Sequence, residues 1–341
     1  MKKTLVALAV VAASGASFAQ VAITGTYAFG YKSTTNVDGK ANDSSGLGMD
    51  TSYVQFAASE DLGAGLKASA QMSLDGLTRA GAFGGDSSIA IEGGFGKFYM
   101  TNSRGPDTMT DYVKGAVGMD GKVFSLITTS DTMAYLTPEL FPGFKIQFQT
   151  IESAINQGSE NVSPIGLGAG AAGAAVTATT TANAQRRNDV RFQYAKGPLA
   201  AAINFLAFDQ QGDAALPANY NNAKNAARGY VRYDFGVARV GAAIYQLNYN
   251  VGKRTDTMLA VNVPLGSLDL GAEWAQRAKD GTLTAGSVSG DYTATGTALS
   301  AKYNLSKRTA VIGTYSRWDV APGATIVGTV NETAILLSHS F

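Results

Sequence analysis

The 341-residue chain contains no cysteine, a single histidine and few long apolar runs. The absence of cysteine excludes disulfides, thiol nucleophiles and metal sites with cysteine ligands, and it is compatible with an exported protein. A helix needs about 20 apolar residues to span a bilayer, and no segment after residue 19 reaches that length. The sequence therefore predicts no membrane-spanning helix in the mature protein.

Neither sign of charge is in excess. The chain has 27 Lys and Arg against 26 Asp and Glu. Without Lys2 and Lys3, which belong to the N-terminal segment described below, the net charge is −1. A nucleic-acid-binding protein would show a basic stripe, so no nucleic-acid partner is expected. The mean hydropathy is neutral, which is typical of a transmembrane barrel whose polar lumen offsets its apolar outside.

The chemistry of an enzyme is also missing. His339 is the only histidine, and a Ser–His or His–metal site needs a held imidazole with partners. Glu60 and Asp61 belong to a turn pattern, and residues 42–50 lack the spaced acids and closing Glu of a calcium-binding loop. We therefore expect no catalytic residue, no metal and no cofactor, and a barrel hydrolase is disfavoured.

Residues 1–19 have the pattern of a signal peptide. Lys2 and Lys3 precede an apolar run, and Ser17–Ala19 offers small residues for cleavage before Gln20. A retained N-terminal anchor is the weaker alternative. We expect one domain over residues 20–341, exported from the cytoplasm.

The two ends of the mature chain alternate in the same way. In residues 333–341, Ile335, Leu337, His339 and Phe341 share one face, opposite mostly small or polar residues, and residues 21–31 repeat the pattern. Large side chains outward and small ones inward suit a wall between lipid and water. Hydrocarbon does not tolerate unpaired backbone groups, so we expect the ends to pair and close a barrel, with Phe341 as an assembly signal. An ordinary soluble sheet edge is the alternative reading of the last stretch.

Similar alternation recurs along the whole chain, and short and long connections take turns. The expected short turns are 59–65, 92–96, 137–143, 195–198, 234–237, 263–267 and 304–308. The expected long loops are 32–49, 76–87, 104–122, 153–188, 209–227, 249–254, 278–292 and 319–330. Seven turns and eight loops join sixteen strands, as in bacterial outer-membrane barrels. Both termini then lie on the short-turn side and face the periplasm.

The longest connection, 153–188, is rich in Gly, Ala and Thr. Such tracts gain little from ordering, which predicts a mobile surface loop rather than a helix.

Four motifs resemble those of the trimeric general porins of Gram-negative bacteria, in the branch common in beta-proteobacteria. They are the first turn at 59–68, the Tyr–Pro–Gly–Phe turn at 135–144, the late turn at 303–309 and the ending His339-Ser340-Phe341. The resemblance covers the mature chain in order. It implies an all-β, 16-stranded antiparallel transmembrane β-barrel, a homotrimer, and a third external loop folded into the lumen.

The inward loop would be 104–122, and its charged residues are candidates for the pore constriction: Arg104, Asp107, Asp111, Lys114 and Asp120, with Lys122 at its end. The family usually places arginines on the facing wall. At the matching positions this chain has Tyr53, Asn102, Thr128 and Ala134. The strongly basic constriction is therefore not carried over, and we expect weak selectivity, neutral to mildly cation-preferring.

Other cations face the lumen by alternation, although each could equally be a rim charge. These pore-wall candidates are Lys67, Arg191, Arg228, Arg232 and Arg239. A strong anion preference would indicate that arginines on other strands rebuild the basic wall.

The expected function is a water-filled outer-membrane channel for passive diffusion of ions and small hydrophilic solutes, without a chemical step. The alternative is a barrel that acts as a surface receptor or adhesin with a blocked lumen. Besides its own copies in a homotrimer, we expect outer-membrane lipid, lipopolysaccharide and the barrel-assembly machinery as partners.

Overall fold

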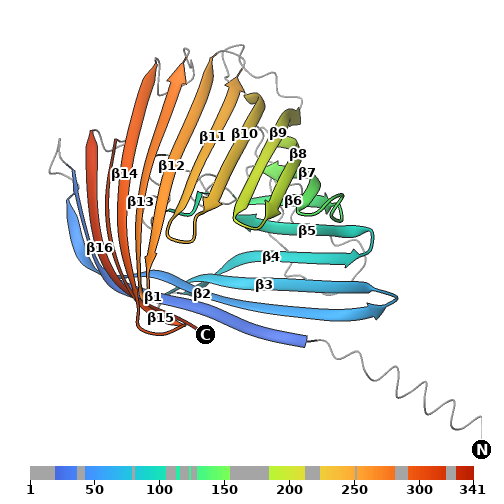
Figure 1. The fold of residues 1–341 in the computed structure, drawn as a ribbon, viewed down its shortest axis with the longest axis horizontal. Helices are drawn as coiled ribbons and strands as arrows, with labels where there is room; N and C mark the ends of the chain where they lie inside the picture. The colour runs from blue at the N-terminus through green and yellow to red at the C-terminus, as the bar shows by residue number, and fades with distance from the viewer. Residues whose placement is uncertain are drawn as a thin grey trace, which may run out of the picture.

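The computed structural model is a closed barrel in which each strand pairs antiparallel with its neighbour in sequence and β1 pairs with β16 (Figure 1). The structure describes residues 20–36, 43–78, 81–104, 113–115, 123, 129–153, 184–211, 223–249, 252–280, 291–319 and 328–341. The strands in the described part of the chain are β1 (Gln20–Asn36), β2 (Ser44–Gly63), β3 (Leu66–Thr78), β4 (Gly81–Gly93), β5 (Gly96–Arg104), β6 (Thr129–Leu136), β7 (Phe144–Ser153), β8 (Ala184–Lys196), β9 (Leu199–Gln211), β10 (Ala223–Asp234), β11 (Arg239–Tyr249), β12 (Lys253–Leu265), β13 (Leu268–Asp280), β14 (Tyr292–Asn304), β15 (Thr309–Asp319) and β16 (Thr329–Ser340).

The two-residue alternation of the sequence becomes the two faces of the barrel wall. On β16, Ile335 is 60% exposed, whereas its neighbours Ala334 and Leu336 are buried. On β1, Phe29 is exposed and Ala28 is buried. Small side chains inside and large apolar ones outside are what a barrel with a lipid-facing surface requires. The predicted faces of the first and last strands are confirmed.

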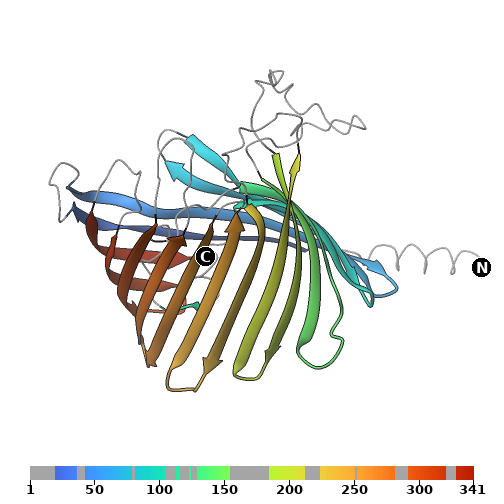
Figure 2. The same cartoon turned by 90° about the horizontal axis from the view of Figure 1, so that it is seen from above.

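All seven short turns lie where the alternation predicts them, and several close neighbouring strands along one edge in Figure 2. In the first turn, Gly63, Ala64 and Gly65 have positive φ. The Asp61 Oδ1 atom accepts a hydrogen bond from the Gly63 N–H at 2.8 Å. Asp and Gly thus supply the conformations that a tight reversal needs.

Most of the predicted loops are too long, because the flanking strands extend into 32–49, 76–87, 153–188, 209–227 and 249–254. Residues 76–87 were expected to be a loop, but β3 runs to Thr78 and β4 begins at Gly81. The Gly-rich start of β4 has little apolar alternation, yet its backbone pairs with β3 through irregular registers such as Asp75↔Phe83. Likewise β8 begins at Ala184, inside the stretch 153–188 that was predicted to be a loop. Backbone pairing with a neighbour extends strands beyond their own side-chain pattern.

The closing seam between β1 and β16 is paired by backbone and side chains. The Gly25 N–H donates to the Phe341 carbonyl at 3.1 Å, and the Phe341 N–H donates to the Gly25 carbonyl at 3.0 Å. A Cβ at Gly25 would lie 2.5 Å from the Phe341 ring. At the other end, the Lys32 Nζ atom lies 3.2 Å from the Glu332 carboxylate. Glycine at position 25 is what lets the terminal aromatic ring close the wall.

No helix in the described ranges is long and apolar enough to cross a membrane. Within the same residues, no group of three or more His, Cys, Asp or Glu side chains could hold a metal ion.

We expect Gly25→Val to impair closure of the barrel, because the new side chain would overlap the Phe341 ring; overpacking of this kind costs about 1–3 kcal/mol. Deleting Phe341 should also impair closure of the barrel. The measurement is the yield of folded, heat-modifiable protein in outer membranes. Gly46→Val is the matched control, because a Cβ at Gly46 meets nothing within 4 Å. Equal yields for both glycine variants would contradict this role of the seam.

Candidate functional site: the lumen wall

The inner wall on strands β1–β6 is small and uncharged over much of its height. Strand register places Thr24, Gln55 and Ser73 side by side across β1–β3. Farther round the barrel, Tyr99 pairs with Ala134 between β5 and β6. The Tyr99 hydroxyl accepts a hydrogen bond from the Gln147 amide at 2.8 Å. At this level, the β1–β6 side of the lumen offers hydrogen-bonding groups without a fixed charge, whereas Lys67, Glu92 and Lys97 lie nearer the short turns and Lys32 lies nearer the loops.

The inner wall on strands β8–β13 is rich in arginine. Inward residues that pair directly from β8 to β13 form one rung across the wall: Arg191, Asn204, Arg228, Tyr245, Asp256 and Arg277. Arg187 on β8 and Arg254 on β12 lie on the loop side of this rung, and Arg232 lies nearer the turn end of β10. We call Arg187, Arg191, Arg228, Arg232, Arg254 and Arg277 the arginine wall.

The acids within this wall are engaged by neighbouring side chains. The Asp256 carboxylate accepts two hydrogen bonds from Arg277, at 2.7 and 2.8 Å. It also lies 3.3 Å from Arg254 Nε. Bidentate pairs of this geometry are the strong ones among charge-assisted hydrogen bonds. Asp256 thus fixes two guanidinium groups while cancelling one charge.

Asp189 is held in a similar way on β8. Its carboxylate accepts hydrogen bonds from Asn204, at 2.9 and 3.1 Å, and from Gln149, at 2.7 Å. Arg228 Nη2 lies 3.9 Å from the same carboxylate. Because cations outnumber Asp189 and Asp256 on these strand levels, the wall presents a positive field to the lumen.

Tyrosine rings lie beside several of the cations. The Arg191 guanidinium carbon is 5.7 Å from the centre of the Tyr230 ring, and that of Arg254 is 5.6 Å from the Tyr245 ring. The Lys279 Nζ atom is 5.7 Å from the Tyr249 ring. These distances are within the range of cation–π attraction, which orients the charged groups without removing their charge.

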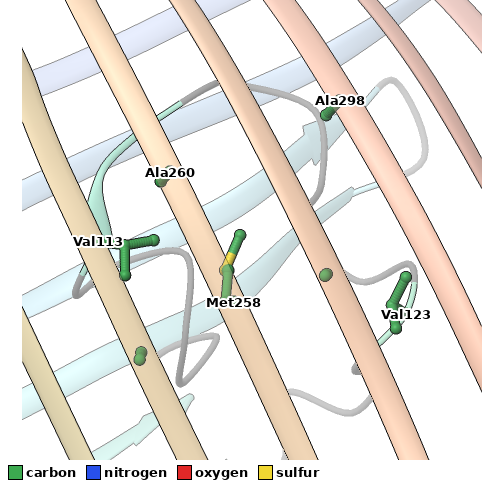
Figure 3. Close-up of a cluster of buried hydrophobic side chains, with 7 residues drawn as sticks. Val113, Val123, Met258, Ala260 and Ala298 are labelled. Carbon is green, nitrogen blue, oxygen red and sulfur yellow. The ribbon is translucent and has the colours of Figure 1, made fainter.

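Val113, Gly115 and Val123, which lie between β5 and β6 in the chain, contact residues of strands β11–β14. Val113 and Val123 are 1% and 2% exposed, and they cluster with Met258, Ala275 and Ala298 (Figure 3). The Gly115 N–H donates to Glu273 Oε1 at 3.0 Å. A Cβ at Gly241 would lie 2.8 Å from Val113. Small residues on the wall leave room for this segment.

The predicted facing-wall residues do not lie together. The Tyr53 hydroxyl donates to the Gln55 amide oxygen on the β1–β6 side. Ala134 is a buried inward residue of β6. Asn102 alternates with inward Tyr99 and Thr101, lies on the outward face with Met100, and donates to Asp131 at 2.5 Å. Asn102 is therefore not a lumen residue at its described position, because one step along a strand reverses the face.

The predicted loop residues are only partly described. Lys114 is exposed between Val113 and Gly115 and has a positive φ. Arg104 ends β5, where its backbone pairs with Thr129. Asp107, Asp111, Asp120 and Thr128 lie outside the described residues.

Two of the predicted wall cations lie near the short turns. The Lys67 Nζ atom is 3.6 Å from Glu92, and the Arg239 Nη2 atom is 3.1 Å from Asp234, with all four side chains substantially exposed. Arg191, Arg228 and Arg232 instead share the arginine wall. Sequence reasoning missed Arg187 and Arg254 because both fell within predicted loops, and it did not select Arg277, although that residue follows the same alternation as Glu273. The alternation of Arg187, Asp189 and Arg191 with Val190 and Phe192 was a usable signal.

These features define a class: an outer-membrane β-barrel with an apolar outside and a charged lumen. A family model described as Gram-negative porin matches residues 4–320. The chain is 27% identical over 340 residues to the outer membrane porin protein 32 of Delftia acidovorans, with 92% of this chain and 88% of the relative covered. The chain belongs to the Gram-negative porin family, and it forms a non-enzymatic diffusion channel in the outer membrane.

Solved structures with low identity share the fold. An anion-selective porin from Comamonas acidovorans superposes with a TM-score of 0.66 at 19% identity, covering 95% of this chain and all of the other. A trimer form of OmpT, an outer membrane protein of Vibrio cholerae, gives a TM-score of 0.65 at 13% identity and covers 95% and 99% of the two chains.

Asp256→Asn should destabilise the folded barrel by about 3–5 kcal/mol, because it leaves Arg277 and Arg254 in a buried place without their carboxylate. The measurement is the temperature at which the folded form converts to the unfolded form on a gel. Asp280→Asn is the control: Asp280 lies 3.9 Å from Lys253 with both side chains more than half exposed, and such pairs contribute up to about 1 kcal/mol. A similar loss in both variants would contradict the structural role of Asp256.

Proposed function

We propose that this porin favours anions, and that the arginine wall carries the preference. The sequence had favoured weak, neutral to mildly cation-preferring selectivity, because the expected arginine positions Tyr53, Asn102, Thr128 and Ala134 hold uncharged residues. The inward arginines on β8, β10, β12 and β13 support a basic wall on other strands. The anion-selective Comamonas porin with the same fold is consistent with this proposal.

The same proposal includes a constriction formed by the connection between β5 and β6. The packing of Val113 and Val123 on inward residues and the Gly115–Glu273 hydrogen bond support it. Fixed charges determine ion preference only where the passage is narrow, because salt screens them within about 10 Å in wide water-filled regions. The docked residues Val113 and Gly115 contact Gly241 and Ala260, on the turn side of the rung that contains Arg228 and Arg277. Anions would therefore meet the arginines directly before the narrowing.

We further propose a homotrimer with both termini in the periplasm and the long connections outside. The trimer form of a protein with this fold supports the assembly. The exposed apolar outer face, with Ile23, Phe205 and Leu337 among its residues, offers surface both to lipid and to neighbouring copies. The N-terminal segment 1–19 stays a predicted signal peptide, and 153–188 a predicted external loop whose residues 154–183 lie outside the described part.

In planar bilayers, the unmutated channel should give a reversal potential of anion-selective sign across a potassium chloride gradient. Arg191→Gln with Arg228→Gln should move the chloride-to-potassium permeability ratio toward unity, because two lumen charges are lost. The matched control is Arg239→Gln with Lys67→Gln, which removes the same charge near the short turns. A cation-selective unmutated channel, or an equal shift in the control, would contradict the assignment to the arginine wall. A barrel that inserts but does not conduct would support the receptor alternative.

Gly241→Leu should alter conductance, because its side chain needs the space that Val113 occupies. Displacing the segment from the wall pushes it toward the lumen axis, so the single-channel current should fall and become noisier. Gly229→Leu on the neighbouring strand is the control, because a Cβ there meets only the Ala202 carbonyl oxygen, at 3.7 Å. Identical single-channel currents in the unmutated protein, Gly241→Leu and Gly229→Leu would contradict a constriction that packs on β11–β14.

A further inference from the structure

The lumen wall contains an apolar area that simple diffusion does not explain. Toward the loop ends of β9–β11, Leu206, Ala226 and Leu247 are buried and cluster with Phe208, Tyr245 and Tyr249. All six are inward by strand register. The interior of a water-filled barrel is ordinarily polar. We call these six residues the vestibule patch.

Cations flank the vestibule patch on both sides. On β8, Arg187 pairs across the strands with Phe208. On β12, Arg254 pairs with Leu247, and its Nη1 atom lies 3.5 Å from the Tyr249 hydroxyl. Lys279 of β13 lies over the Tyr249 ring. Apolar surface is thus framed by positive charge at two edges.

The charges at these edges are suited to an incoming anion. Within the described part of the chain, the Nε–H of Arg187 is buried without a hydrogen-bond acceptor. Asp256, the acid nearest Arg254, already accepts two hydrogen bonds from Arg277. A buried guanidinium donor without an acceptor favours a ligand that brings a carboxylate oxygen.

We propose that the vestibule patch and its flanking cations form a weak binding site for aromatic monocarboxylates, with the ring on the half-buried Phe208 and Tyr249 and the carboxylate toward Arg187 or Arg254. This rests on the proposed anion preference and adds a solute class to it. A small inorganic anion uses only the charges. A ring with a carboxylate uses both the apolar area and the charges, because apolar burial adds to the electrostatic attraction.

The experiment measures block of the potassium chloride current in planar bilayers by sodium benzoate, sodium acetate and neutral benzyl alcohol. Benzoate should block at concentrations on the order of tenfold lower than acetate, because its ring buries additional apolar area. Benzyl alcohol should not block, because it lacks the charge. Equal block by benzoate and acetate, or block by benzyl alcohol as strong as that by benzoate, would overturn the proposal.

Variants assign the effect to the patch. Phe208→Ala should bring the benzoate-to-acetate ratio to within about twofold of unity, since a tenfold difference corresponds to about 1.4 kcal/mol of contact. Phe205→Ala is the matched control, an outward phenylalanine on the same strand that should keep the ratio. If Phe208→Ala does not fold, Phe208→Leu replaces it and should move the ratio in the same direction. A loss of heat stability with an unchanged ratio would show that the patch packs within the chain itself and would overturn the site.

The reversal potential separates this proposal from the one it rests on. A benzoate preference that depends on Phe208 in a channel without anion selectivity would contradict the arginine-wall function and leave the site in place. An anion-selective channel that benzoate and acetate block equally would support the arginine-wall function and overturn the binding site.

Discussion

The structure depends on one constraint: a backbone in hydrocarbon must satisfy its own hydrogen bonds. A sheet meets this constraint only if its last strand pairs with its first, and here β16 pairs with β1 along residues 26–36. The final residue extends that ladder, because Gly25 and Phe341 exchange both backbone hydrogen bonds. A side chain at position 25 would collide with the ring that ends the chain. Closure of the wall therefore depends on the absence of one Cβ as much as on any attractive contact.

Once the barrel is closed, the alternation of side chains assigns each residue to lipid or lumen, and the lumen can differ from one strand to the next. Strands β1–β6 present Thr, Ser, Gln and Ala to the lumen. Strands β11–β14 present small residues where Val113 and Gly115 contact the wall. The arginines of β8, β10, β12 and β13 lie mostly on the loop side of these contacts. Buried carboxylates keep the arginines in place. Asp256 cancels one positive charge but orients two guanidinium groups, so the field that remains has a fixed direction.

The sequence predicted the strands, the turns and both faces of the wall, because each follows from residues near one another in the chain. It did not predict which side of the lumen is basic. The position of the basic side depends on which residues of neighbouring strands pair with one another, and on how far each strand extends. Arg187 and Arg254 looked like loop residues because Gly, Thr and Asn tracts lie beside them, yet pairing with β9 and β11 draws them into strands. Asn102 shows the reverse case, in which a shift of one residue moves a side chain from the lumen to the outer face.

A basic lumen and a neutral one place different demands on a diffusion channel. Charges that are too exposed are screened, and charges that bind too tightly would hold the solute, since conduction requires both entry and release. The arginine wall lies between these limits. Asp189 and Asp256 offset part of its charge, and Tyr230 and Tyr245 hold Arg191 and Arg254 through their ring faces. Under the proposed anion preference, an anion passing this wall would exchange one partly satisfied guanidinium for the next, so attraction at each step would be balanced by competition from the groups already there.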